Sequence, residues 1–199
     1  MIVWFGPSIL EIGDACPDLI VLPEYVDRDE VIRAARRFPK AMVVGAYEVC
    51  GVMRGVLWHG GQRRVRYTKV CQDNGSFAPL PTRSPIYETA EVSIAVLVCR
   101  DIDWVPLKSR IDAELAISPT PVKLVCVPAR MTADWFSGET VLLPAPGVPM
   151  VVSNSIQHPD NRVRSFIANG SGQREHKQEE VEAVLFDACH LWQSQHSGA

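Results

Sequence analysis

The segment "VSIAVLVCRDIDW", residues 92–104, gives the clearest indication of the fold. Its first half is rich in β-branched and small apolar residues, which is typical of a strand buried on both faces. The run then ends abruptly in Cys99, Arg100 and Asp101. A thiol therefore lies where a buried strand meets charge, and strand ends are where α/β proteins commonly place their active sites.

Short apolar runs alternate with amphipathic ones along the rest of the chain. Strands are predicted at 18–23, 41–49, 55–60, 64–70, 123–128, 149–155 and within 162–173. Helices are predicted at 28–38, 107–116 and 132–143, and in 177–192, where Val181, Val184, Leu185, Ala188 and Trp192 follow helical spacing. A Gly-Gly hairpin signal links 55–60 to 64–70, which favours a layered α/β domain with mixed sheets over a parallel one.

The composition limits the classes of protein to consider. The chain has 199 residues, 47% of them hydrophobic and 22% charged, so we expect a single globular domain over residues 1–199. A net charge of -3 gives no electrostatic reason to expect nucleic acid or an anionic membrane as a partner. We find no secretory signal or apolar run of membrane-spanning length, and therefore expect a cytoplasmic protein with reduced thiols. The six cysteines form no CxxC pair, so no metal site is predicted.

Three predicted strands end in side chains that could act together. Glu24 follows "LIVLP", Lys69 lies near the end of "RVRYTK", and Cys99 follows "SIAVLV". A thiol attacks as the thiolate, so it needs a base or a cation nearby, and Glu24 and Lys69 could supply them. Taken singly, each residue also has a structural interpretation: a core cysteine, a capping carboxylate and a solvated lysine.

The contexts of these residues resemble a known family. In order, "DLIVLPEY" (18–25), "RYTK" (66–69) and "IAVLVCRD" (94–101) resemble the three catalytic signatures of the nitrilase superfamily of carbon–nitrogen hydrolases. Similarity continues in 43–48, 127–136, 149–155 and 164–173, so it covers nearly the whole chain. The resemblance implies a four-layer αββα sandwich of two mixed sheets flanked by helices.

The same resemblance implies roles for named residues. Glu24 would be the general base, Lys69 the stabiliser of the tetrahedral intermediate and Cys99 the nucleophile that forms a thioester. The substrate would be a small amide, carbamoyl or nitrile compound, with no cofactor and no metal. Substrate-binding candidates are Arg100, Arg130, Met131, Trp135 and Asn154. The family commonly pairs subunits across a sheet, so a homodimer is expected.

The residues that follow the nucleophile differ from the family pattern. Arg100 could lower the pKa of the thiol if it enters the pocket, although alternation along a strand directs it away from Cys99. Asp101 is expected to bond backbone amides in the turn after the strand.

Two further departures leave an alternative open. Only 12 residues separate "MIVWF" from "DLIVLPE", so the sandwich should have a reduced helical layer near its amino terminus. Many members carry another glutamate after the lysine, whereas here Asp73 is the nearest substitute. The alternative is a catalytically weak or inactive nitrilase-like module that binds a small molecule or a protein partner. A thiol protease would need a histidine base, and none of the five histidines lies in such a context.

Overall fold

A computed structural model describes residues 1–6, 9–72, 75–131, 141–155, 165–177 and 184–187. Its strands form two sheets of six. The first has the order β12-β1-β2-β3-β4-β5 and comprises β1 (Ile2–Phe5), β2 (Leu19–Glu24), β3 (Met42–Val49), β4 (Val52–His59), β5 (Gln62–Thr68) and β12 (Val184–Asp187). The second has the order β11-β10-β9-β8-β7-β6 and comprises β6 (Ile86–Glu88), β7 (Val92–Val96), β8 (Val122–Ala129), β9 (Met150–Asn154), β10 (Phe166–Ala168) and β11 (Arg174–Lys177).

Both sheets are mixed, as the sequence predicts. In the first sheet β1, β2 and β3 run parallel, and the hairpins β3–β4 and β4–β5 extend it antiparallel. In the second sheet β7, β8 and β9 run parallel between antiparallel edges. The parallel strands are buried on both faces, which explains their nearly continuous apolar sequences.

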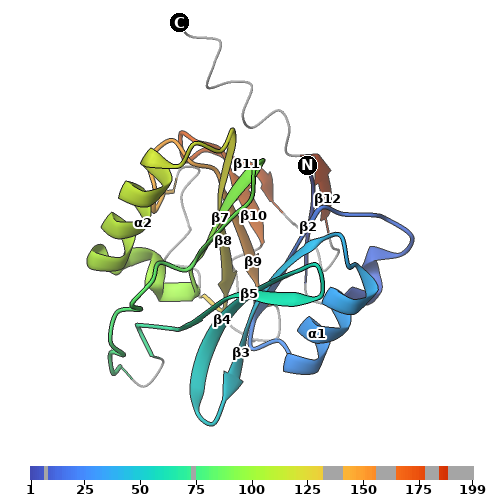
Figure 1. Ribbon diagram of the computed structural model, residues 1–199, viewed down its shortest axis with the longest axis horizontal. Helices are drawn as coiled ribbons and strands as arrows, with labels where there is room; N and C mark the ends of the chain where they lie inside the picture. The colour runs from blue at the N-terminus through green and yellow to red at the C-terminus, as the bar shows by residue number, and fades with distance from the viewer. Residues whose placement is uncertain (7–8, 73–74, 132–140, 156–164, 178–183, 188–199) are drawn as a thin grey trace, which may run out of the picture.

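Helices flank the sheets and complete the four layers (Figure 1). α1 (Arg28–Arg37) and α2 (Val105–Ile117) lie on opposite outer sides of the pair of sheets. Asp27 caps the amino terminus of α1, where its carboxylate accepts the Asp29 N–H at 2.8 Å. Val31 and Ala34 face the first sheet at helical spacing. The predicted αββα sandwich is confirmed.

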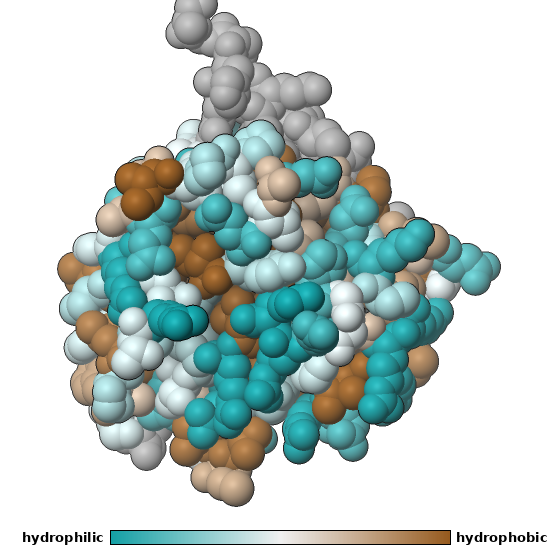
Figure 2. Space-filling model, in the orientation of Figure 1, coloured by the Kyte–Doolittle hydropathy of each residue, from teal (hydrophilic) through white to brown (hydrophobic). Residues whose placement is uncertain are grey.

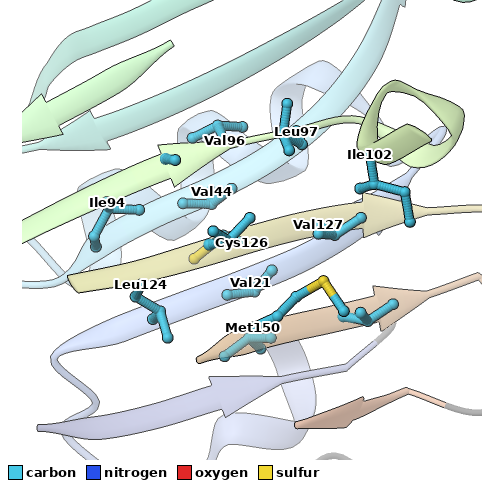
Figure 3. Packing of buried hydrophobic residues seen from close by; sticks show 14 of the residues in the cluster. Val21, Val44, Ile94, Val96, Leu97, Ile102, Leu124, Cys126, Val127 and Met150 are labelled. Carbon is cyan, nitrogen blue, oxygen red and sulfur yellow. The ribbon is translucent and has the colours of Figure 1, made fainter. Parts of the chain in front are cut away.

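The main core lies between the two sheets. Figure 3 shows Val21 and Val44 of the first sheet packed against the strands that carry Cys126, Val127 and Met150 of the second. Cys126 is fully buried there, and burial raises the pKa of its thiol. This cysteine is therefore a core hydrophobe, and the apolar contact between the sheets fixes how their strand ends face one another.

The amino-terminal helical layer is reduced, as the short connection predicts. Between β1 and β2, the described residues contain only a short 3-10 helix, η1 (Ile9–Ile12). Ile9 and Ile12 join the apolar cluster under α1, and Arg37 of α1 donates to the carbonyl oxygen of Gly13 at 2.8 Å. One helical turn thus covers part of the surface that a longer helix would cover.

The predicted carboxy-terminal helix is wrong where the structure can test it. Val184–Asp187 forms β12, which pairs antiparallel with β1. The edge of β1 offers a row of backbone donors and acceptors, and pairing with it overrides the helical spacing of the apolar residues. Val181, Ala188 and Trp192 lie outside the described residues, as does most of the helix predicted at 132–143, and Val141–Leu143 is not helical. The tail helix therefore gives no support to a homodimer, which stays a prediction.

Within the described ranges, none of the helices is both long enough and apolar enough to cross a membrane.

Candidate active site

Glu24 is placed by an irregularity at the end of β2. The register with β3 shifts between Val21 and Glu24, where Pro23 cannot donate to the ladder. Tyr25 follows with a φ of 64°, which ends the strand at once. The Glu24 side chain is consequently held at the strand end, and the residue remains buried.

Lys69 meets Glu24 in a buried ion pair. Lys69 directly follows β5, and its backbone N–H donates to the carbonyl oxygen of Met53 at 3.0 Å. Its Nζ lies 2.6 Å from Glu24 Oε1, and the two side chains are 0% and 1% exposed. Removing two charges from water is costly, and here each charge is compensated by the other.

Cys99 occupies a strained turn at the end of the β7 segment. Its φ is 51°, in the left-handed region that non-glycine residues rarely adopt, and it begins the 3-10 helix η2 (Cys99–Asp103). Strain of this kind persists where surrounding contacts enforce it, and it is common at active sites. The thiol is near the backbone of Arg130, with Sγ 3.8 Å from that carbonyl oxygen.

The electrostatics of Cys99 link it to the ion pair. Burial raises the pKa of Cys99 to about 12, and the charge of Glu24 and a hydrogen bond with its carboxylate add to this increase. The Lys69 ammonium and the bond to the Arg130 backbone act in the opposite direction. At neutral pH the resting sulfur is therefore a thiol, and it lies beside an acid that can accept its proton. The structure thus brings Glu24, Lys69 and Cys99 together.

Two sets of hydrogen bonds fix the turn at Cys99 against the residues on either side of Lys69. The Asp101 carboxylate accepts the N–H groups of Val70 and Cys71 at 3.0 and 2.8 Å. Asp101 thus bonds amides 30 residues away, whereas the sequence suggested amides in its own turn. The Tyr67 hydroxyl accepts the Val98 N–H at 2.6 Å and is also bonded to Asp101.

Tyr67 is the residue that sequence reasoning missed. Burial raises the pKa of Tyr67 well above its ordinary value, with the charge of Asp101 adding to the effect. Its ring lies over Gly55 of β4, where a Cβ would run into the ring. The sequence could have indicated Tyr67 only through its pairing with Gly55 in the predicted hairpin. The role of that pairing depends on the second sheet, whose Val98 bonds to the Tyr67 hydroxyl.

The predicted substrate-binding residues differ in what surrounds them. Arg130 is exposed, and its guanidinium lies 4.9 Å from the centre of the Tyr25 ring at the rim of the site. Asn154 is buried and exchanges two hydrogen bonds with the backbone of Met131, at 2.9 and 3.2 Å. Its side-chain amide therefore holds the end of β8 in place.

The remaining predicted residues are an exposed arginine next to Cys99 and two residues outside the described ranges. Burial raises the pKa of Cys71 to about 11 and that of Asp103 above its ordinary value, and the charge of the exposed Arg100 opposes both increases. Trp135 and Asp73 fall outside the described residues. Among the residues that the structure describes, no cluster of three or more His, Cys, Asp or Glu side chains could hold a metal ion.

Comparisons with known proteins identify the fold. No family model and no curated protein matches the sequence. A cysteine-to-alanine mutant of the Nesterenkonia AN1 amidase from the nitrilase superfamily is similar in structure, with a TM-score of 0.68 and 17% identity over 98% of this chain and 94% of that one. A glutamate-to-glutamine mutant of that amidase, which shows Michael addition of acrylamide at its active-site cysteine, gives a TM-score of 0.70 and 18% identity over 98% and 96%. A complex of the amidase with butyramide gives 0.65 and 17% over 96% and 92%. The resemblance read from the motifs is thus confirmed at the level of structure: the chain has the fold of the nitrilase-superfamily amidases.

Proposed function

We propose that the protein is a thiol-dependent hydrolase that cleaves a non-peptide carbon–nitrogen bond, most simply that of a small amide. The observation that carries this proposal is the buried Glu24–Lys69 ion pair beside the thiol of Cys99. An inactive module would gain little by keeping two charges out of water next to a thiol in a strained turn. The Nesterenkonia amidase shares this fold, and a mutant of it is known in complex with butyramide, so an amide is the first substrate to test.

The mechanism assigns one role to each group. Glu24 takes the proton of the Cys99 thiol as the sulfur attacks the amide carbon, so a thiolate is produced only when substrate is in place. The negative charge then moves to the amide oxygen, where the Lys69 ammonium and the Arg100 backbone N–H would stabilise it. Protonated Glu24 returns the proton to the leaving nitrogen, and ammonia or an amine departs.

A second half-reaction regenerates the enzyme. Glu24, again a carboxylate, takes a proton from water, and the resulting hydroxide attacks the thioester carbon. The tetrahedral intermediate collapses, the acid product leaves, and the sulfur recovers the proton from Glu24. Arg130, Met131, Trp135 and Asn154 are proposed to shape the substrate pocket, Arg130 by binding a substrate carboxylate at the rim. Asp73 is proposed as an auxiliary acid, and residues 1–199 as one domain.

The experiment is ammonia release from a panel of small amides by wild-type protein and by Cys99→Ala. We expect release by the wild type and none by the variant. Cys50→Ala is the matched control, because Cys50 is exposed and shares the positive φ of Cys99. Mass spectrometry after exposure to acrylamide should find the adduct on Cys99 before the exposed Cys16 and Cys50. Equal labelling of all three cysteines, or unchanged release by Cys99→Ala, contradicts the proposal.

A further inference from the structure

A second group of charged side chains lies on β4 and on β5, which is the edge strand of the first sheet. Gly55 and Tyr67 are paired and face the core between the sheets. Because successive strand residues alternate between faces, Arg54, Arg66 and Thr68 lie on the opposite face. Hydrophilic side chains gather over these two strands in Figure 2.

These side chains line a cavity of about 460 Å³ between the strands and the segment at 78–83. Its walls include Arg54, Arg66, Tyr67, Thr68, Pro81 and Arg83, and none of its lining residues is acidic. Three guanidinium groups thus converge on one cavity in a chain whose net charge is -3. The positive charge is therefore concentrated at this cavity, since the protein as a whole is slightly acidic.

The three arginines that line the cavity have few side-chain hydrogen bonds to the described residues. Arg54 donates from Nη1 to Thr68 Oγ1 at 2.8 Å, but its Nε is buried and finds no hydrogen-bond partner among the described residues. The described residues therefore offer the Arg54 guanidinium fewer acceptors than it has donors, which leaves its positive charge incompletely satisfied beside the cavity. Arg66 and Arg83 are exposed, and neither side chain forms a hydrogen bond or ion pair with any described residue.

The opposite wall is held by a fourth arginine that does not line the cavity. Arg110 of α2 donates to the carbonyl oxygens of Pro81 at 2.6 Å and Thr82 at 2.8 Å. These contacts fix the 78–83 segment to the helix and use two carbonyl acceptors that could otherwise pair with the cavity's guanidinium groups. The cavity therefore has one wall fixed to α2 and is lined by guanidinium groups that have more hydrogen-bond donors than nearby acceptors.

We propose that this cavity binds the phosphate group of a small molecule. Guanidinium groups bind carboxylate and phosphate through paired hydrogen bonds. A carboxylate offers two oxygens in one plane, whereas a terminal phosphate offers three oxygens that can meet donors from β4, β5 and the 78–83 segment. The volume falls within the range of small-molecule sites, about 300–1,000 Å³, and leaves room for an organic portion.

The test is isothermal titration of the full-length protein with inorganic phosphate, pyrophosphate and succinate at constant ionic strength. We expect phosphate to bind, and Arg66→Gln and Arg83→Gln each to weaken it by about tenfold or more, the usual effect of losing a charge-assisted hydrogen bond. Both side chains are exposed, so the variants should fold, which circular dichroism will verify. Arg63→Gln is the matched control, because Arg63 is an exposed arginine of β5 outside the cavity.

Three results would overturn the assignment. The first is the absence of phosphate or pyrophosphate binding up to about 10 mM, where even a millimolar Kd is measurable. The second is tighter binding of succinate than of phosphate, which would make the site one for carboxylates. The third is an equal loss in Arg63→Gln and Arg66→Gln, which would reduce the effect to general surface charge. None of these measurements depends on hydrolase activity, so failure here leaves the proposed function untouched, and the reverse also holds.

Discussion

Glu24→Gln tests the proposed chemistry most directly because it changes one proton acceptor and little else. Glutamine keeps the shape of glutamate, and its carbonyl oxygen can still accept from Lys69 Nζ, now 2.6 Å from the carboxylate. It cannot take a proton from the sulfur. With the pKa of Cys99 raised to about 12, an isolated thiol would be ionised in only about one molecule in 10⁵ at pH 7.

The consequence is a change in both rate and pH dependence. In the wild type, Glu24 removes the proton inside the site, so the reactivity of Cys99 should vary little between about pH 7 and 9. In Glu24→Gln the proton must go to solvent, so the rate at pH 7 should fall on the order of 10²–10⁴-fold, the usual contribution of a general base. The rate should then rise about tenfold per pH unit as the thiolate fraction grows. Because the charge of Glu24 itself raises the pKa of Cys99, this rise should level off below pH 12.

The assay is peptide mass spectrometry of acrylamide alkylation at Cys99 across this pH range, together with ammonia release from an amide that the wild type hydrolyses. Glu48→Gln is the control, because Glu48 is an exposed acid on the neighbouring strand β3. Wild-type reactivity of Glu24→Gln at pH 7 would refute the reasoning. An equal loss of Cys99 reactivity in Glu48→Gln would also refute it.

Three further predictions concern the residues that hold this site. Lys69→Met should lower the free energy of unfolding by about 3–5 kcal/mol, because it leaves the Glu24 carboxylate buried and unpaired, and urea unfolding measures the loss. Gly55→Ala would place a Cβ in the Tyr67 ring, so we expect a loss of about 1–3 kcal/mol in urea unfolding and slower alkylation of the site thiol. Burial raises the pKa of Asp101 above its ordinary 3.8, so the folded state favours the protonated form and loses stability as pH rises through that raised pKa. Asp101→Asn should remove this pH dependence, so the difference in unfolding free energy between the two proteins should change as the pH rises above 3.8. A difference that stays constant with pH would contradict the prediction.

Much of the fold can be predicted from local sequence pattern, because its central strands are apolar and are separated by polar turns and loops. The runs at 18–23, 41–49, 92–98 and 123–128 correspond to β2, β3, β7 and β8, and the amphipathic run at 28–38 to α1. Strand identity also places Glu24 and Cys99 at strand ends without any knowledge of tertiary contacts. The prediction works where burial on both faces leaves a signature in the sequence.

The failures share a different physical cause. Val184–Asp187 follows a run of glutamates and falls in a helical pattern, and only the free edge of β1, far away in sequence, turns it into a strand. The partners of Asp101 are likewise set by contact with a segment 30 residues earlier. Spacing along the chain carries no information about such pairings, so the sequence could identify these residues without revealing what they touch.

The candidate site is assembled by the contact between the two sheets, and this explains which supporting residues matter. Glu24 and Lys69 come from ends of the first sheet, whereas Cys99 comes from the end of a strand in the second. Neither sheet alone could bring acid, ammonium and sulfur together. The bond from the Val98 N–H to Tyr67 and the Asp101 bonds to the segment after Lys69 both cross from one sheet to the other. These cross-sheet bonds fix the strained Cys99 turn against the ion pair, so a loosened interface should cost reactivity at Cys99 before it costs the fold.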